Sequence, residues 1–367
     1  MSARGGRSPR APGEFSRTMA LTHRENYLRT ITRTGPEWIP AMVSISGASQ
    51  KDYFAEMQDV MARHPLIFPG FQKAERPPES FFSTGGASEY TDTWGCVWET
   101  GVEGLSGVVL RSPLADWSAF DTYQLPDPMQ VSDFGLFDWE GAARNIAAGR
   151  EAGALTSGGF EHGFFIMRLW YLRGFENMML DLASDEPHMH ELIEKMIGYA
   201  SARVAKWLEF GVDMIHFGDD MGTQTASLVS PAMFGKWFTP AYRRIFQPCR
   251  DAGAYVFLHS DGHVIELVDE FIAAGVDVVN IQDLCNGIDD LAREVKGRVS
   301  LELDIDRQSV LPYGTRAEVR ALVEEEVRKL GSPEGGLSLV AGIYPPTPPE
   351  NVDALCDAIE EFRTYWW

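Results

Sequence analysis

The residues of this chain best suited to chemistry are a histidine and an aspartate at alternate positions, His259 and Asp261. Alternate residues of a β-strand project to the same side, so both side chains are expected to face one site. Histidine nitrogen and carboxylate oxygen both bind zinc, and a catalytic zinc site has three protein ligands and one open position. Glu302, or alternatively Cys285, would complete the set. The spacing therefore indicates a zinc site held by His259, Asp261 and Glu302.

Further polar residues follow apolar segments of the chain. Asp219 and Asp220 follow one apolar run after a single glycine, Gln282 closes another, and Glu302 and Asp304 alternate along a third. A soluble core does not hold so many polar and ionisable groups without partners, which favours one shared polar pocket. Carboxylates gathered in a pocket also suit proton transfer, with one acid of raised pKa beside an ionised neighbour. A plainer interpretation stays open, in which each aspartate caps a turn or pairs with an arginine, and the histidine is a hydrogen-bonded core residue.

Regular alternation of apolar runs and helical patterns would position these residues. After residue 155, apolar runs of four to seven residues alternate with amphipathic segments, which predicts a parallel sheet with helices outside it. One continuous series favours a single (β/α)8 barrel, an α/β fold whose chemistry collects at the carboxyl ends of the strands. Thr22 and Glu25 have the spacing of a capping box, so a helix is expected to begin there. The predicted strands are 38–43, 163–169, 214–217, 255–258, 276–281, 299–303 and 337–340, and residues 50–150 are expected to form long loops with short helical patches.

Composition excludes several classes of protein. The 32 Lys and Arg against 53 Asp and Glu give a net charge of −21, which repels a phosphate backbone and makes nucleic acid an unexpected partner. The sequence has no apolar run of about 18 residues that would cross a membrane. It also lacks the glycine-rich signatures of dinucleotide-binding and P-loop proteins. Four scattered cysteines suit a reducing compartment, so a cytoplasmic protein is expected.

The N-terminal residues differ from the rest. Residues 1–18 hold four arginines among Gly, Ser and Pro. They lack the apolar core of a secretory signal. We expect a disordered basic tail over 1–21 and one folded domain over 22–367.

Seven segments of the chain resemble the uroporphyrinogen decarboxylase superfamily, which includes porphyrin decarboxylases and cobalamin-linked methyltransferases. The resemblance implies a (β/α)8 barrel, in agreement with the interpretation above. The order and spacing of the segments match over residues 22 to the end. These segments are LTHRE at 21–25, DTWGCVW at 92–98, WYLRGFEN at 170–177, GDDMG at 218–222, HSDG at 259–262, LPYGT at 311–315 and PPTPPEN at 345–351.

The resemblance also bears on the branch of the family. The catalytic aspartate and tyrosine of the decarboxylases correspond to Asp92 and Tyr171, but their late histidine falls near Ala341 and their arginine-containing first strand has no arginine here. The methyltransferases hold zinc through a His-x-Cys pair and a late cysteine, which here become His259-x-Asp261 and, again, Ala341. The resemblance thus argues against uroporphyrinogen as substrate.

We therefore expect an enzyme of the methyltransferase-like branch that moves a methyl group between a small substrate and a corrinoid carried by a separate protein. A metal-independent decarboxylase or lyase of a small carboxylic acid and a non-catalytic binding protein are the alternatives. A homodimer is expected from the family. The expected catalytic residues are Asp220, Tyr171, Asp92 and Asp219, and the expected substrate-binding residues are His259, Asp261, Glu302 and Gln282.

Overall fold

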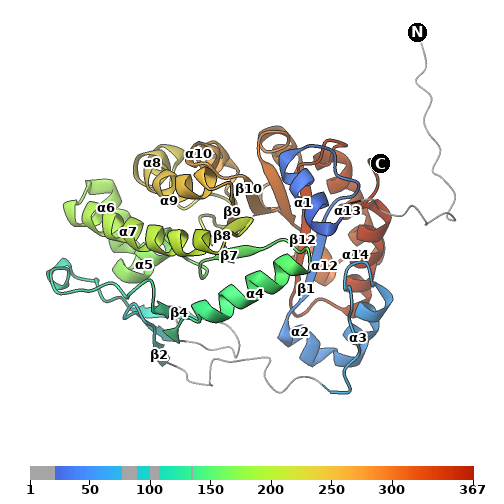
Figure 1. The fold of residues 1–367 in the computed structure, drawn as a ribbon, viewed down its shortest axis with the longest axis horizontal. Coiled ribbons are helices and arrows are strands. Elements are labelled where there is room, and N and C mark those ends of the chain that lie inside the picture. Colours follow the sequence, from blue (N-terminus) through green and yellow to red (C-terminus); the bar gives the residue numbers. More distant parts are fainter. Residues whose placement is uncertain (1–20, 77–88, 100–106, 134) are drawn as a thin grey trace, which may run out of the picture.

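A computed structural model describes residues 21–76, 89–99, 107–133 and 135–367. All but the last residue of the tail predicted over 1–21 lies outside these ranges. The centre of the fold is a parallel sheet of seven strands, with helices arranged around it (Figure 1). The strand order is β1-β12-β11-β10-β9-β8-β7. The strands are β1 Ala41–Ile45, β7 Ser157–Gly159, β8 Met214–Gly218, β9 Tyr255–Ser260, β10 Val278–Gln282, β11 Ser300–Asp304 and β12 Leu337–Ile343.

Helices follow most strands and cover the outside of the sheet, as the alternating pattern predicts. None of the described helices has the length and apolar character that a membrane span requires. The helices are α1 His23–Thr32, α2 Gly47–Asp52, α3 Phe54–Arg63, α4 Trp139–Glu151, α5 Ile166–Arg173, α6 Phe175–Ser184, α7 Pro187–Glu209, α8 Pro231–Trp237, α9 Thr239–Asp251, α10 Val268–Ala274, α11 Ile288–Glu294, α12 Val310–Tyr313, α13 Arg316–Leu330 and α14 Pro349–Phe362.

The barrel-type α/β architecture predicted from the sequence is confirmed, with one difference in strand number. Seven strands pair in the described part of the chain, and β1 and β7 are the two end strands. The region 50–150, predicted as loops, also holds the 13-residue helix α4 and two small antiparallel sheets. The small sheets comprise β2 Glu89–Thr91, β3 Val97–Glu99 and β4 Val108–Arg111, and β5 Val131–Ser132 with β6 Gly135–Leu136.

The strand predicted over 163–169 is wrong. All seven residues from 163 to 169 are buried, and the last four of them lie in α5. A continuous apolar run does not distinguish a buried helix from a buried strand. The strand at this place in the sheet is β7, only three residues long, two of them glycine. A side chain on Gly158 would collide with Trp207, whose ring lies 2.3 Å from the ideal Cβ position. Close packing of α7 on the sheet therefore requires glycine in β7, and a strand of this composition has no apolar run that would reveal it in the sequence.

Helix α1 lies against the amino-terminal ends of the strands. Its Ile31 packs with Met214, Phe257 and Val278, one residue from each of three neighbouring strands. The capping box of Thr22 and Glu25 is present, as predicted. This helix covers the end of the sheet opposite to the one where the predicted site residues gather.

Candidate active site

The carboxyl ends of β8 and β9 bring three of the predicted site residues together. Gly218 of β8 pairs in register with His259 of β9, so the residues that follow are neighbours. The backbone N–H of Asp261 donates to Asp220 Oδ1 at 3.0 Å. His259 Nε2 lies 3.6 Å from Asp220 Oδ1 and 3.6 Å from Asp261 Oδ1. Asp220, His259 and Asp261, three of the residues expected to share a site, therefore lie together at the ends of β8 and β9.

His162, which the sequence analysis missed, joins this cluster. It lies in the loop after β7, and its Nε2 is 2.9 Å from Asp220 Oδ2. The centre of its ring lies 5.4 Å from that of His259. Its position three residues after a strand could reveal it, but only when that strand is placed at 157–159 rather than at 163–169.

The two residues of this contact shift each other's proton affinity. The hydrogen bond to Asp220 raises the pKa of His162, although burial opposes the effect. Burial alone would raise the pKa of Asp220, but the hydrogen bond and charge of His162 outweigh burial and hold that pKa below its ordinary value. At neutral pH Asp220 is therefore an ionised acceptor that attracts a positive charge.

A network behind His259 decides which of its nitrogens faces the site. The Asn280 amide nitrogen donates to the backbone carbonyl of Glu302 at 2.9 Å, so its Oδ1 is free to accept. His259 Nδ1 lies 2.6 Å from that Oδ1 and must therefore be the donor. Nε2 of the neutral ring is then left with a lone pair that points toward Asp220 and Asp261.

His162, Asp220 and His259 can offer a metal ion one ligand atom each. These three atoms all lie within 4.8 Å of one another. Two nitrogens and one carboxylate oxygen match the ligand types of catalytic zinc, and a second hydrogen bond that fixes the tautomer, as Asn280 does here, is typical of metal-bound histidine. The donor set therefore fits zinc, although it differs from the predicted set of His259, Asp261 and Glu302.

The predicted ligand Asp261 has another partner, and Glu302 lies elsewhere. Arg307, also missed by the sequence analysis, holds both oxygens of Asp261, at 2.6 and 2.7 Å. Glu302 pairs in register with Asn280, which in turn pairs with His259, so Glu302 is two strands away from the histidine. Its carboxylate has no hydrogen-bond or ion-pair partner among the described residues. Burial, aided by the charge of Asp304, raises the pKa of Glu302 to about 7.

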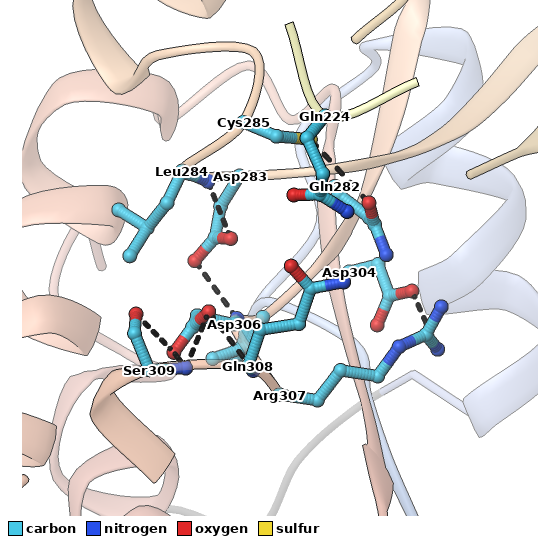
Figure 2. Close-up of a pocket in the computed structure, with 11 residues that line it drawn as sticks. Gln224, Gln282, Asp283, Leu284, Cys285, Asp304, Asp306, Arg307, Gln308 and Ser309 are labelled. Carbon is cyan, nitrogen blue, oxygen red and sulfur yellow. Dashed lines mark hydrogen bonds and ion pairs between the residues drawn. The ribbon is translucent and has the colours of Figure 1, made fainter. Parts of the chain in front are cut away.

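A cavity of about 380 Å³ adjoins this cluster at the ends of β10 and β11. Figure 2 shows Arg307 extended along it, with its guanidinium beside Asp304 and the amide of Gln282 close by. Burial raises the pKa of Asp304 to about 7, although the charge of Arg307 opposes the effect. Gln282, predicted to bind substrate, lines the cavity and accepts a hydrogen bond from the N–H of Gly262 at 3.0 Å. The cavity thus offers amide and guanidinium groups to a small polar molecule.

Asp219, predicted to be catalytic, is fully buried and bound on all sides. Its carboxylate accepts from the backbone N–H of Ile166 and Met167 at 2.5 and 2.8 Å and from the Tyr242 hydroxyl at 2.7 Å. Burial raises its pKa to about 6, although these hydrogen bonds oppose the effect. The carboxylate caps the first turn of α5 from another element, so its place in the structure is that of an anchor.

Asp92 and Tyr171 both contact Arg168 of α5. The Asp92 carboxylate accepts from Arg168 at 3.1 Å, from the Trp98 indole at 2.9 Å and from two backbone N–H groups, and its side chain is 1% exposed. Arg168 also binds Asp133 and lies over the Tyr171 ring. Burial raises the pKa of Tyr171 well above its ordinary value. The structure therefore places Asp92 in a buried ion-pair network rather than at the ends of β8 and β9.

Comparison with known proteins identifies the family. The family model described as uroporphyrinogen decarboxylase (URO-D) matches residues 100–362. The uroporphyrinogen decarboxylase of Thermus thermophilus is 28% identical over 196 residues, which are 52% of this chain and 53% of that protein. The enzyme of the same name from Nostoc punctiforme is 24% identical over 190 residues, or 49% of each chain. The matches thus span about half the length of these curated relatives.

A solved structure supports the fold over a longer stretch. A methyltransferase from Methanosarcina mazei superposes with a TM-score of 0.61 at 17% identity, covering 93% of this chain and 99% of the other. At this identity the likeness concerns the fold alone. Since the family model covers well over half of the sequence, the resemblance inferred from the seven motifs is confirmed: this chain belongs to the uroporphyrinogen decarboxylase family.

Proposed function

We propose that this family member is a methyltransferase, which moves a methyl group between a small substrate and a corrinoid carried by a partner protein, with zinc held by His162, Asp220 and His259. The observation that carries the proposal is the convergence of these three ligand atoms within 4.8 Å at the ends of β7, β8 and β9. Three protein ligands leave one position open, as in catalytic zinc sites. The Methanosarcina protein that shares this fold is a methyltransferase, which is consistent with the proposed activity.

The proposed role of each residue follows from its contacts. When bound, zinc would supply Lewis acidity at the heteroatom that gives up or receives the methyl group. His259 presents Nε2 because Asn280 fixes its tautomer. Gln282 and Arg307 line the adjoining cavity and would orient a polar substrate there. Methyl transfer needs the nucleophile aligned behind the methyl carbon, and a site at the end of the sheet can hold a substrate in one orientation for that purpose.

A direct assay tests the proposal. Zinc-loaded protein is mixed with free cob(I)alamin and with methoxy, methylthio or methylamino compounds, and formation of methylcobalamin is followed by absorbance. We expect transfer from at least one class of donor, and a loss of at least about 100-fold in His162→Ala, since removal of a ligand removes the bound metal. Exposed His23 lies at the start of α1, so His23→Ala is the matched control. Zinc binding without transfer from any donor class would contradict methyl transfer.

The alternative of a metal-independent decarboxylase is favoured by the names of the two curated relatives. In such an enzyme Asp92 and Asp220 would stabilise positive charge or shuttle protons. Asp92 is engaged by Arg168 and 1% exposed, which argues against contact with substrate. Release of carbon dioxide from a small carboxylic acid by metal-free protein, unchanged in His162→Ala, would decide for the decarboxylase.

A further inference from the structure

Asp261 lies between two groups that compete for its carboxylate. On one side His259 Nε2 is 3.6 Å from Oδ1. On the other side Arg307 Nη2 is 2.6 Å from the same oxygen and 2.7 Å from Oδ2. The side chain of Asp261 is 35% exposed, so it has room to change partners. The position of this carboxylate therefore depends on which neighbour attracts it more strongly.

The backbone around Asp261 is held in place and cannot move the carboxylate from one neighbour to the other. Gly262 has a positive φ of 84°, and a side chain there would meet the Gly222 backbone at 2.4 Å, so the two turns are in close contact. The N–H of Asp261 is bound to Asp220, and that of Gly262 to Gln282. Only rotation of the Asp261 side chain can move its carboxylate between His259 and Arg307.

Arg307 is itself held in place by groups other than Asp261. Its Nη1 lies 3.1 Å from Asp304 Oδ2, and its guanidinium lies over the Tyr344 ring at 5.7 Å. Its side chain is 20% exposed, and it extends along the cavity (Figure 2). The planar guanidinium of Arg307 contacts two carboxylates and donates its hydrogen bonds in fixed directions. It therefore holds a carboxylate more specifically than the point charge of a lysine would.

We propose that Arg307 is a positioning residue that holds Asp261 out of the zinc ligand set, so that the fourth position stays open to substrate. The inference rests on the proposed function, because it assumes zinc on His162, Asp220 and His259. A fourth protein ligand would convert an open catalytic site into a closed structural one. Without Arg307, Asp261 can rotate toward His259 and bind the metal itself.

The test compares zinc affinity in a set of variants of the full chain. Affinity is measured by competition with a chromogenic chelator, and Co²⁺ replaces zinc for visible spectra that report the coordination number. We expect Arg307→Met to bind zinc at least about tenfold more tightly and to change the Co²⁺ spectrum, because it gains a ligand. Asp261→Asn alone should retain the parental affinity, and the double variant should lose the gain. Arg298→Met, which removes an arginine from the surface pairs with Asp269 and Glu294, is the matched control.

The outcomes separate the two proposals. Parental zinc affinity and an unchanged Co²⁺ spectrum in Arg307→Met would overturn the role of Arg307 alone. A loss of affinity in Asp261→Asn as large as in Asp220→Asn would also overturn it, because Asp261 would then already be a ligand. Failure of the unaltered protein to bind zinc would overturn the zinc site and with it this inference. If Arg307→Met does not fold, Arg307→Lys keeps a positive charge near Asp304 without the planar fork, and its affinity should rise in the same direction.

Discussion

Glu302 shows how one residue can be recognised as unusual and still be given the wrong neighbours. The sequence shows that Glu302 and Asp304, two residues apart on one strand, point to the same side. The register agrees, because Glu302 pairs with Asn280 and Asp304 pairs with Gln282 of the neighbouring strand. Which side chains lie next to Glu302 and Asp304 depends on the order of the strands and on the loops at the strand ends. Asp261 therefore meets Arg307, and the carboxylate of Glu302 has no hydrogen-bond or ion-pair partner in the described part of the chain.

The half-buried side chain of Glu302 should make stability depend on pH. Burial raises its pKa to about 7 in the folded protein, above about 4.3 in the unfolded chain. The folded state therefore holds the proton more tightly, and this contribution is present below pH 4 and lost as pH rises through 7. Glu302→Gln cannot ionise, so between pH 5 and pH 8 the parent should lose about 2 kcal/mol of unfolding free energy relative to the variant. Urea denaturation of both proteins at the two pH values measures this, and an equal difference at both would contradict it.

At the scale of elements, β7 and α5 mark the limit of prediction from the sequence. Longer strands such as β8, β9 and β10 were located to within two residues, because each is a single apolar run between helical patterns. Strand β7 carries glycine where Trp207 packs, so it has little apolar signal, and the sequence predicts the strand over the neighbouring apolar run 163–169 instead. With the strand expected at 163–169, His162 lies before the strand rather than after its carboxyl end, so it is not recognised as a site residue.

The contribution of Asp219 to the stability of α5 can be measured directly. The carboxylate binds two N–H groups of the first turn and the Tyr242 hydroxyl. Tyr242→Phe removes one hydrogen bond and should cost about 1 kcal/mol, whereas Asp219→Ala leaves buried donors unpaired and should cost about 3 kcal/mol. Chemical denaturation gives both values. If Asp219 were chiefly catalytic, Asp219→Ala would abolish activity without this loss of stability.

For the whole molecule, the site depends on parts of the chain outside the family match. The matched region begins at residue 100, yet β1 comes before it and pairs along its whole length with β12. Helix α1 also precedes the match and covers the amino-terminal ends of the strands. The sheet that carries His162, Asp220 and His259 is therefore completed by the segment 22–45, and binding at the site should be coupled to the stability of the whole fold.

That coupling gives a prediction for zinc and global unfolding. The ligand atoms come from the loops after β7 and β8 and from β9 itself, and they meet only in the folded chain. A metal that binds the folded state alone stabilises it by about 3 kcal/mol at 100 times its dissociation constant. Zinc added to chelator-washed protein should therefore raise the thermal midpoint, and His162→Ala should abolish most of the rise while His23→Ala retains it. Because the proton of His162 competes with the metal and its pKa is raised, the rise should be larger at pH 8 than at pH 6. Differential scanning calorimetry at the two pH values measures both effects, and an equal rise in His162→Ala and in the parent would show that zinc binds elsewhere.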